Sequence, residues 1–455
     1  MQHLPPVVFT GGSGPATGSR AFECRSLTIR VWVSGSLSSL AIAGRREEEV
    51  MYQACVGIDW ATTEHVVCVL DQNGRRLSRF RVDHTEDGLD DLVNKLGGFG
   101  DRADVGVAIE RPDGLVVDRL LEAGHQVVPV KPAAIRAYAS AETPSGAKSD
   151  PADAETIAEY LRLKAARLEP LRPYSPQTRA LRETSRTRVR LVRRRVRATN
   201  QLETTLGVWW PGALTAFPDL DTDIAMAFLT RYPTPEAAAH LGPKRMERFL
   251  DIAGYSGYGG RRSGQEIIDL IRKAPHGAGT GQSAANCQAI IAAQVNTLSA
   301  LRDAIKDLRR AIRTQLDEHP DAEIFLSLPH SGMINAAQML AEWGDVRQAY
   351  PDPDSVAAQA GVSPVTRQSG KYRSVHFRWA CNKWFRQAMT TYTDNSRHGN
   401  QWANDVYQRA RARGCDHPHA IRILARAWIR IIWRCWIEHN PYNPDRHGNL
   451  QALTG

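Results

Sequence analysis

The chain has 455 residues, with 58 lysines and arginines against 49 aspartates and glutamates and a sequence pI near 9.3. This length predicts two or three domains with hydrophobic cores, and the basic balance favours a polyanionic partner. The seven cysteines contain no CxxC pair and no closely spaced series, which excludes a disulfide framework, argues against a zinc site and predicts reduced thiols in a cytosolic protein.

The first fifty residues differ from the rest of the chain. They are rich in glycine and serine, have little hydrophobic periodicity and end in the charge cluster Arg-Arg-Glu-Glu-Glu shortly before Met51. No basic segment precedes an apolar one, so the pattern is not that of a signal peptide. We expect residues 1–50 to be disordered or an extension beyond the natural start, which we place at Met51.

Residues 51–168 are predicted to form an α/β domain. The expected elements are two strands joined by a tight turn within 53–70, an exposed strand ending at 83, a helix over 86–97, a strand ending at 110, a helix near 113–123 and a strand over 126–130. Three consecutive strands followed by alternating helix and strand predict an RNase H-like mixed sheet. In open α/β sheets, ligands bind at the carboxyl ends of the strands.

Four acidic side chains lie at the ends of these elements. Asp59 and Glu110 each close an apolar strand, and Asp150 and Asp153 share one face of a helix because they are three residues apart. An unpaired buried carboxylate is costly, so acids gathered at one point predict divalent cations held through oxygen ligands. Asp59, Glu110, Asp150 and Asp153 are therefore predicted to bind Mg²⁺, as two ions, in the arrangement of two-metal phosphoryl transfer.

Each acid also has a simpler explanation. Asp59 or Glu110 alone is typical of a turn at the end of a strand. The stretch from Asp150 to Asp153 fits a helix start, with an aspartate as N-cap and a proline at the first helical position. Capping and metal binding are compatible, and four acids at these element ends favour the metal site.

Positive charge is concentrated in the second part of the chain. Residues 51–168 carry 14 basic and 19 acidic side chains, whereas residues 169–455 carry 39 and 26. Nine arginines and one acid occupy 179–197, a density that would repel itself without a counter-anion. A solvated helix face is the alternative, but we predict contacts to a phosphate backbone. The residues assigned to these contacts are Arg179, Arg182, Arg186, Arg190, Arg193, Arg194, Arg195 and Arg197.

A long helix is predicted over 284–317, where apolar residues recur every three or four positions from Ile291 to Leu316. The narrow stripe is typical of a coiled coil, and the helix would be roughly 50 Å long. We expect it to pack on a helix over 155–206 or on a second protomer. Residues 208–282, interrupted by proline and glycine, are predicted to form a small helical insert with a flexible loop.

Residues 325–343 resemble a helix-hairpin-helix, with a proline, a turn ending in Gly332 and a second helix. In such a hairpin the glycine lets backbone N–H groups approach a phosphate, as at other helix N-termini. An ordinary helix–turn–helix connection fits the sequence nearly as well.

The last apolar stretch, 418–437, has an arginine at every fourth position from Arg422 to Arg434. Each of these charges would be costly in hydrocarbon, which excludes a membrane span. We expect a helix docked on the core through Trp428 and Trp436, with its arginines turned to nucleic acid; a helix lying on a membrane surface is the alternative.

Several of these stretches together resemble one family. The motifs VGIDWATTEHVVCVLDQNG, VAIERPDG, VVPVKPAAIRAYA and KSDPADAETIAEYL resemble the RuvC-like half of the DEDD transposase and Piv-type DNA invertase family, the insertion-sequence 110 group of recombinases. The stretches LPHSGMINAAQMLAEWGDVRQ and VAAQAGVSPVTRQSGKYR resemble the second, serine-containing half. The resemblance covers most of residues 51–440.

This resemblance implies a nucleophilic serine at Ser369. A hydroxyl that attacks a phosphodiester needs activation and a cationic setting, and the contacts to nucleic acid are assigned here to Arg367, Lys371 and Arg373. Ser-Gly is also a common turn dipeptide. Ser363, which precedes a proline, and Ser374, which begins a strand-like run, are ranked below Ser369.

The resemblance also implies a domain order and partners. We expect a RuvC-like DEDD domain over 51–168, a basic helical and coiled-coil region over 169–318 and a mainly α, serine-containing transposase domain over 319–455. The partners would be donor and target DNA, a structured guide RNA encoded by the element and further copies of the chain in a dimer or tetramer. The protein would be cytoplasmic, in a prokaryote, and associated with the nucleoid.

Two other functions fit the residues. In an RNase H-like nuclease or Holliday-junction resolvase the acids would suffice, and Ser369 would be a turn residue. In a non-catalytic nucleic-acid scaffold the acids would only cap helices and strands. Retained cutting by Ser369→Ala would indicate the nuclease, and the absence of Mg²⁺-dependent cleavage would indicate the scaffold.

Overall fold

The computed structural model describes residues 52–142, 150–255, 261–370 and 372–445. Residues 1–50, which we expected to be disordered or extraneous, lie outside these ranges. The chain divides into two compact units, Met1–Leu171 and Arg172–Gly455. Each unit is described by itself.

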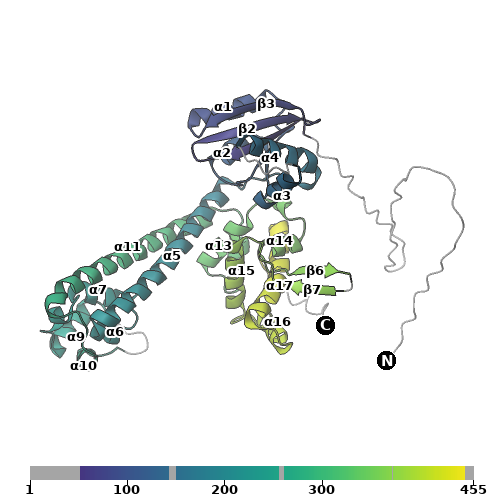
Figure 1. The fold of residues 1–455 in the computed structure, drawn as a ribbon. Coiled ribbons are helices and arrows are strands. Elements are labelled where there is room, and N and C mark those ends of the chain that lie inside the picture. The colour runs from purple at the N-terminus through teal and green to yellow at the C-terminus, as the bar shows by residue number, and fades with distance from the viewer. Residues whose placement is uncertain (1–51, 143–149, 256–260, 371, 446–455) are drawn as a thin grey trace, which may run out of the picture. The chain divides into compact units, whose positions relative to one another are not determined.

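The first unit contains a five-stranded sheet (Figure 1). Its strands are β1 (Ala54–Trp60), β2 (Glu64–Asp71), β3 (Arg76–Asp83), β4 (Val105–Ile109) and β5 (Gln126–Pro129). They lie in the order β3-β2-β1-β4-β5; β2 is antiparallel to both β1 and β3, whereas β4 and β5 run parallel to β1. The expected mixed sheet is therefore present, with β1 at its centre.

Helices cover both faces of this sheet. The first face carries α1 (Glu86–Gly97) and α2 (Leu115–Glu122), whose leucines and valines pack with Val56 and Ile58 of β1. The second carries α3 (Pro132–Glu142) and α4 (Asp150–Lys164), which pack with Cys55 and Val128 and with the even-numbered residues of β2. Because β1 is buried on both sides, its first five residues are apolar or glycine, as the sequence suggested.

A glycine allows α4 to lie close to β1. A Cβ atom at Gly57 would stand 2.1 Å from the carbonyl oxygen of Ala154 and 2.4 Å from the amide nitrogen of Ala158. No side chain fits in that space, so the helix backbone rests directly on the strand. This contact lies one turn of α4 beyond Asp150 and two residues before Asp59.

The second unit contains two long helices, α5 (Pro176–Trp209) and α11 (Ala284–Asp317), each 34 residues long. The prediction of a helix over 284–317 is confirmed, and its buried stripe packs on α5. The expected helix over 155–206 is not continuous: its residues up to Lys164 belong to α4, and those from Pro176 onward belong to α5. The chain leaves the helical conformation after Arg167, at a segment containing Pro170, Pro173 and Pro176, and α5 starts at the last of these, capped by Ser175.

Between α5 and α11, the described residues form five short α-helices and one 3-10 turn, Gly281–Ser283. The five helices are α6 (Pro211–Ala216), α7 (Asp223–Arg231), α8 (Pro235–Ala238), α9 (Pro243–Ile252) and α10 (Gly264–Lys273). Their core centres on Phe228 and includes Leu202 and Leu206 of α5 and Cys287 and Ile291 of α11. The expected helical insert is therefore present, and its loop at 256–260 lies outside the part of the chain that the structure describes.

The rest of the second unit is mainly helical. Its elements are α12 (Ala322–Leu326), α13 (Met333–Trp343), α14 (Pro353–Gln359), the hairpin β6 (Val365–Ser369) and β7 (Tyr372–His376), α15 (Lys383–Ser396), α16 (Gln401–Ala412) and α17 (His417–Glu438). Trp343, Trp428 and Trp436 are fully buried in its core. Within the described ranges, no helix is both long enough and apolar enough to cross a membrane.

Candidate functional site

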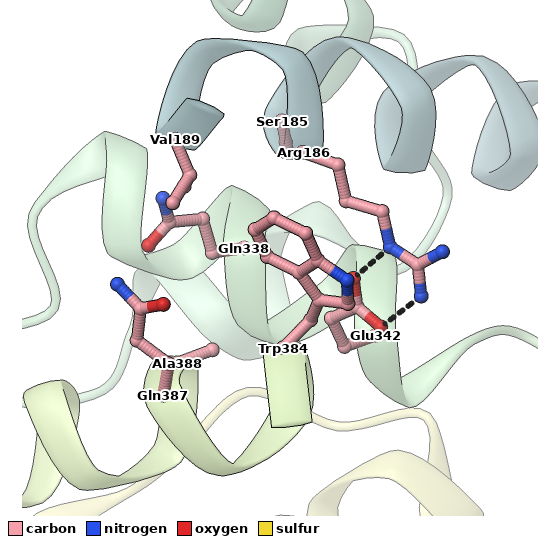
Figure 2. A pocket seen from close by; sticks show the side chains of 8 residues that line it. All are labelled: Ser185, Arg186, Val189, Gln338, Glu342, Trp384, Gln387 and Ala388. Atoms are coloured by element: carbon pink, nitrogen blue, oxygen red, sulfur yellow. Dashed lines mark hydrogen bonds and ion pairs between the residues drawn. The ribbon is translucent and has the colours of Figure 1, made fainter. Parts of the chain in front are cut away.

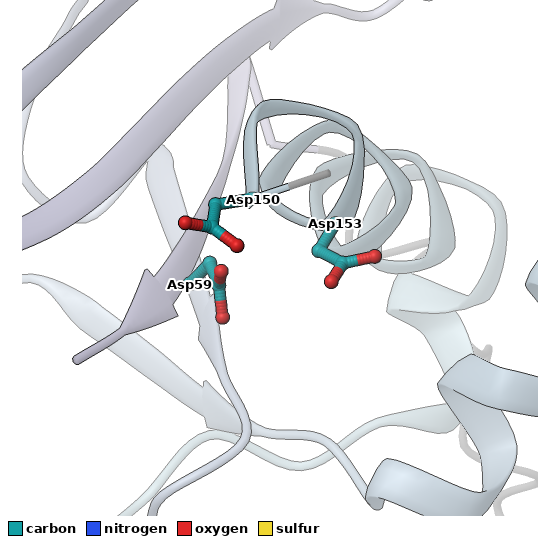
Figure 3. A group of neighbouring side chains, drawn as sticks. All are labelled: Asp59, Asp150 and Asp153. Atoms are coloured by element: carbon teal, nitrogen blue, oxygen red, sulfur yellow. The ribbon is translucent and has the colours of Figure 1, made fainter. Parts of the chain in front are cut away.

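Three of the four predicted acids come together in the first unit. Asp59 lies near the end of β1, and Asp150 and Asp153 lie in the first turn of α4 (Figure 3). One carboxylate oxygen from each residue lies within 4.8 Å of the others. Asp59 and Asp153 are half-buried, whereas Asp150 is exposed. Residues some ninety positions apart therefore form one acidic group at an edge of the sheet.

Glu110 is not part of that group of three. It follows β4 directly, and Ile58 of β1 pairs with Ile109 of β4, so Glu110 and Asp59 are the next residues along two neighbouring parallel strands. Both acids therefore leave the sheet at the same edge. Asp150 is the first residue of α4, and residues 143–149 before it lie outside the described ranges, so its role as an N-cap stays a prediction.

The donor set suits a hard cation. Two oxygens bound to one Mg²⁺ lie about 3 to 4 Å apart at the usual bond length of about 2.1 Å. One oxygen of each of the three carboxylates lies within 4.8 Å of the others, close to this spacing. They fit a divalent cation in charge and chemistry, because carboxylate oxygens are the ligands that Mg²⁺ and Mn²⁺ prefer.

Basic and aromatic residues surround this edge of the sheet. The guanidinium of Arg111 lies over the Trp60 ring at 4.5 Å, and the His65 ring stacks on the same Trp60 ring at a centroid distance of 6.2 Å. His65 and His84 share a hydrogen bond of 2.8 Å between Nε2 and Nδ1. Burial, together with the charge of His84, lowers the pKa of His65 to about 4. His65 is thus neutral at neutral pH, a feature that the sequence did not reveal.

The predicted serine lies on an exposed hairpin in the second unit. Ser369 is the last residue of β6 and pairs with Tyr372 of β7. Arg367 pairs with Ser374, and Gln368 with Arg373, so both arginines flank the turn and both are exposed. Lys371, the third cation assigned to this turn, lies outside the described residues.

The two rival serines have different surroundings. The Oγ atom of Ser374 lies 2.7 Å from Nε2 of His376, two residues along the same strand. Ser363 sits before the hairpin, where its backbone carbonyl accepts a hydrogen bond of 3.1 Å from Arg378. Ser374 therefore has a base within reach, which the sequence-based ranking did not anticipate.

Two arginines of the 179–197 run bind one buried carboxylate. Nε and Nη2 of Arg186 donate hydrogen bonds of 2.7 and 2.8 Å to the carboxylate of Glu342, which is 4% exposed on α13 (Figure 2). Arg182 lies 3.5 Å from the same carboxylate, and Nδ2 of Asn382 donates to it at 2.7 Å. Glu342 was missed from the sequence, although an acid within the apolar stretch AAQMLAEW is a signal for such a partner.

The remaining arginines of the run differ in exposure. Arg190 and Arg193 lie over the Trp384 ring at 5.5 and 5.0 Å, and Arg195 pairs with Asp221 at 3.3 Å. Arg194 and Arg197 are exposed. An open concavity of about 640 Å³ is lined by four exposed members of the run and two valines: Arg190, Val192, Arg193, Arg194, Val196 and Arg197. Arg179 is half-buried near the start of α5.

The arginines of the α17 stripe also differ in their contacts. Arg422 lies over the Phe377 ring at 4.9 Å, and Arg434 pairs with Glu438. Arg430 is exposed, while Trp428 and Trp436 are buried on the opposite side. The helix is docked on the core through its tryptophans, as the sequence indicated.

Comparisons with known proteins agree with this organisation. One family model, described as an IS110-type DEDD transposase, matches residues 56–211, and a second, described as transposase of the IS116/IS110/IS902 family, matches residues 322–408. The first match contains the three clustered acids and the whole of α5, and the second contains Glu342 and the Ser369 hairpin.

Three relatives match over nearly their whole length. The "Mini-circle putative transposase for IS117" of Streptomyces coelicolor is 30% identical over 403 residues, which is 86% of this chain and 95% of that protein. The 42 kDa protein of insertion element IS900 from Mycobacterium paratuberculosis is 27% identical, covering 85% and 96%. The 44.8 kDa protein of insertion element IS116 from Streptomyces clavuligerus is 28% identical, covering 86% and 96%. The chain belongs to the IS116/IS110/IS902 family of transposases.

Proposed function

We propose that this transposase cuts and rejoins DNA with divalent cations held by Asp59, Asp150, Asp153 and Glu110 and with a serine nucleophile, Ser369. The observation that carries the proposal is the convergence of three carboxylates from β1 and α4 within 4.8 Å. The strand order β3-β2-β1-β4-β5 supports an RNase H-like, RuvC-like domain, and in such a sheet the acids lie at the carboxyl edge of the central strands.

The acids would act by holding the cations at a fixed point. When bound, two divalent ions polarise the scissile phosphate and stabilise both the attacking and the leaving oxygen. Asp59 is fixed by the strand, and Asp150 and Asp153 by the first turn of α4, so their positions depend on how closely α4 rests on Gly57. Glu110, next to Asp59 along the parallel strand, would complete the set.

The serine would act by forming a covalent link to DNA. The Oγ atom of Ser369 attacks phosphorus and loses its proton to a base, the bond from phosphorus to the leaving strand oxygen breaks, and that oxygen takes up a proton. The new serine–phosphate ester conserves the energy of the broken phosphodiester, so a hydroxyl of the second strand can reverse the step and join the strands. Arg367 and Arg373 flank the turn and would stabilise charge on the phosphate.

Guidance by an RNA and assembly into a dimer or tetramer complete the proposal. Residues 169–455 carry 39 basic side chains against 26 acidic ones, and exposed arginines line the concavity on α5. Such contacts bind nucleic acid through phosphates and shape, and sequence would then be read by base pairing to the RNA. Sequencing of the nucleic acid that copurifies with the protein tests this part.

A covalent adduct tests the serine directly. Labelled element-end DNA is incubated with the full chain and Mg²⁺, denatured and separated from free DNA. We expect label attached to wild-type protein and to Ser374→Ala, and no label on Ser369→Ala. An adduct on Ser369→Ala that disappears in Ser374→Ala would make Ser374, with its partner His376, the nucleophile. Cleavage without any adduct in all three proteins would indicate the nuclease alternative.

A further inference from the structure

A cationic pocket of about 460 Å³ lies in the second unit, and no residue of the Ser369 hairpin lines it. Residues from α5, α11, α13 and α15 line it, among them Arg188, Arg193, Arg309, Gly332 and Asn335. No acidic side chain is among the described residues that line it. The pocket therefore collects positive charge from two long helices without a carboxylate to balance it.

Arg188 shows how unbalanced this charge is. Its Nε atom is buried and has no hydrogen-bond partner in the described part of the chain. Burial, followed by the charges of Arg309 and Arg195, lowers the pKa of Arg188. Cations that are held together and left without a counter-ion are unfavourable in the free protein and favour an anionic ligand.

The opposite wall offers neutral hydrogen-bond donors. Asn335 is only 8% exposed, yet both its Oδ1 and its Nδ2 lack a partner among the described residues. It lies in the first turn of α13, an 11-residue helix whose N-cap, Gly332, has no side chain to bind the first N–H groups. The N–H group of Asn335 donates to the carbonyl of Gly332 at 2.8 Å, whereas those of Met333 and Ile334 have no partner among the described residues and carry the positive end of the helix dipole.

Gly332 leaves this helix end open. A Cβ atom there would meet nothing within 4 Å, and the backbone angles, φ −64° and ψ 151°, are accessible to every residue. The space in front of the first turn is thus kept free by the absence of a side chain and not by a strained backbone. An alanine would meet no clash and no backbone strain there, and its methyl group would stand where an anion would bind.

We propose that this pocket binds one phosphate of a nucleic-acid backbone, held by Arg188 and Arg309, by the side-chain amide of Asn335 and by the N–H groups at the start of α13. The N–H groups of arginine suit phosphate oxygens in charge and geometry. The buried amide of Asn335 adds a neutral donor. The proposal rests on the proposed function only in taking nucleic acid as the ligand. The site positions the backbone and takes no part in the chemistry.

Paired substitutions test the site in the full chain, in EDTA so that no cleavage occurs. The probes are a short DNA duplex and a short RNA hairpin. Gly332→Ala should weaken binding about tenfold, as expected for losing charge-assisted hydrogen bonds, while Gly242→Ala, at the similarly open N-cap of α9, should leave it unchanged. Arg309→Gln should lower the slope of log K against log salt by about 0.7 to 0.9, whereas Arg310→Gln, whose side chain pairs with Asp307, should not.

Asn335→Leu separates a ligand-binding role from a structural one. Removing a buried group that has no partner should keep or raise Tm, and binding should still weaken several-fold. A loss confined to the duplex assigns the phosphate to DNA, a loss confined to the hairpin assigns it to RNA, and a loss on both assigns it to either backbone. Unchanged binding of both probes by Gly332→Ala and Asn335→Leu would overturn the proposal, whatever the outcome of the adduct experiment.

Discussion

The acid cluster and the serine hairpin are built in opposite ways. The acids are fixed by a central strand buried on both faces and by a helix whose backbone rests on Gly57. The hairpin consists of two five-residue strands that pair only with each other and expose most of their side chains. Tyr372 is 71% exposed, and Trp379, just beyond β7, is 76% exposed.

This difference indicates two kinds of active-site part. A cluster set in a core is preorganised, since folding alone brings its ligands together. An isolated two-stranded ribbon is marginally stable in water, and exposed aromatic side chains are typical of surfaces that bind bases or other protein. We therefore expect the acids to be in place before DNA binds, and the serine to be positioned by nucleic acid. The following predictions test this contrast.

The largest effect is expected for Asp153→Asn. Loss of one ligand charge removes several kcal/mol of stabilisation by the cations, so Mg²⁺-dependent cleavage should fall by about 10³-fold or more. Tm and DNA binding should stay near those of the wild type, because the side chain serves chemistry and not docking. Asp91→Asn, an exposed helix residue paired with Lys95, is the control. Cleavage by Asp153→Asn within tenfold of the wild-type rate would contradict a preformed metal site.

The second-largest effect is the recovery of cleavage when two inactive variants are mixed. If the acids of one chain work with the serine of another, Asp59→Ala and Ser369→Ala should restore each other in mixed oligomers. For a freely exchanging dimer, at most about a quarter of the sites would be intact. Cleavage is measured after co-refolding, with exchange followed by a size-tagged copy. Background activity in spite of complete exchange would place both parts of each active site in one chain.

Gly57→Ala should displace α4 and with it the two acids that α4 contributes to the cluster. The new Cβ would overlap the backbone of α4, which we expect to cost about 1–3 kcal/mol of unfolding free energy. A shift of α4 by about 1 Å would also lower cleavage by about 10²-fold. Gly97→Ala, at the end of α1 with nothing within 4 Å of its Cβ position, is the matched control and should be stable and active. Urea unfolding and cleavage rates measure both effects, and equal behaviour of the two variants would show that α4 has room to adjust.

The smallest effects separate members of the arginine run. Arg186→Gln leaves the buried Glu342 without its two-point partner and should lower the unfolding free energy by about 1.5–3 kcal/mol. Arg194→Gln, at an exposed position, should leave stability unchanged and lower the salt slope of nucleic-acid binding by about 0.7 to 0.9. The opposite pattern would mean that Arg194 supports the fold and that Arg186 is available to phosphate.

Local patterns predicted much of the first unit. Apolar runs located the strands, and acids at their ends indicated a site because parallel strands present their carboxyl ends at one edge. Three of the four acids do meet, and the spacing of apolar residues located α11 over 284–317. These features depend on neighbours in sequence or on the regular geometry of a sheet.

Features that depend on distant partners could not be predicted. The arginine run appeared uniform in sequence, but a single buried carboxylate on α13 binds two of its members, and a tryptophan on α15 stacks on others. The break before α5 was missed because helical periodicity on both sides outweighed three spaced prolines. Ser374 and His376 lie on the same face of β7 because they are two residues apart. Their contact could be inferred only once that strand had been located.

The antiparallel pair formed by α5 and α11 has a consequence for how such transposases diversify. One end of the pair contributes Leu181, Ile312 and Leu316 to the core around Trp343, and the other end contributes Leu202 and Cys287 to the separate core around Phe228. The segment between Trp209 and Ala284 is thus joined to the rest of the chain at the end of α5 and the start of α11, which lie next to each other. The segment between these ends can therefore be lengthened, shortened or replaced in evolution without a change in the core around Trp343.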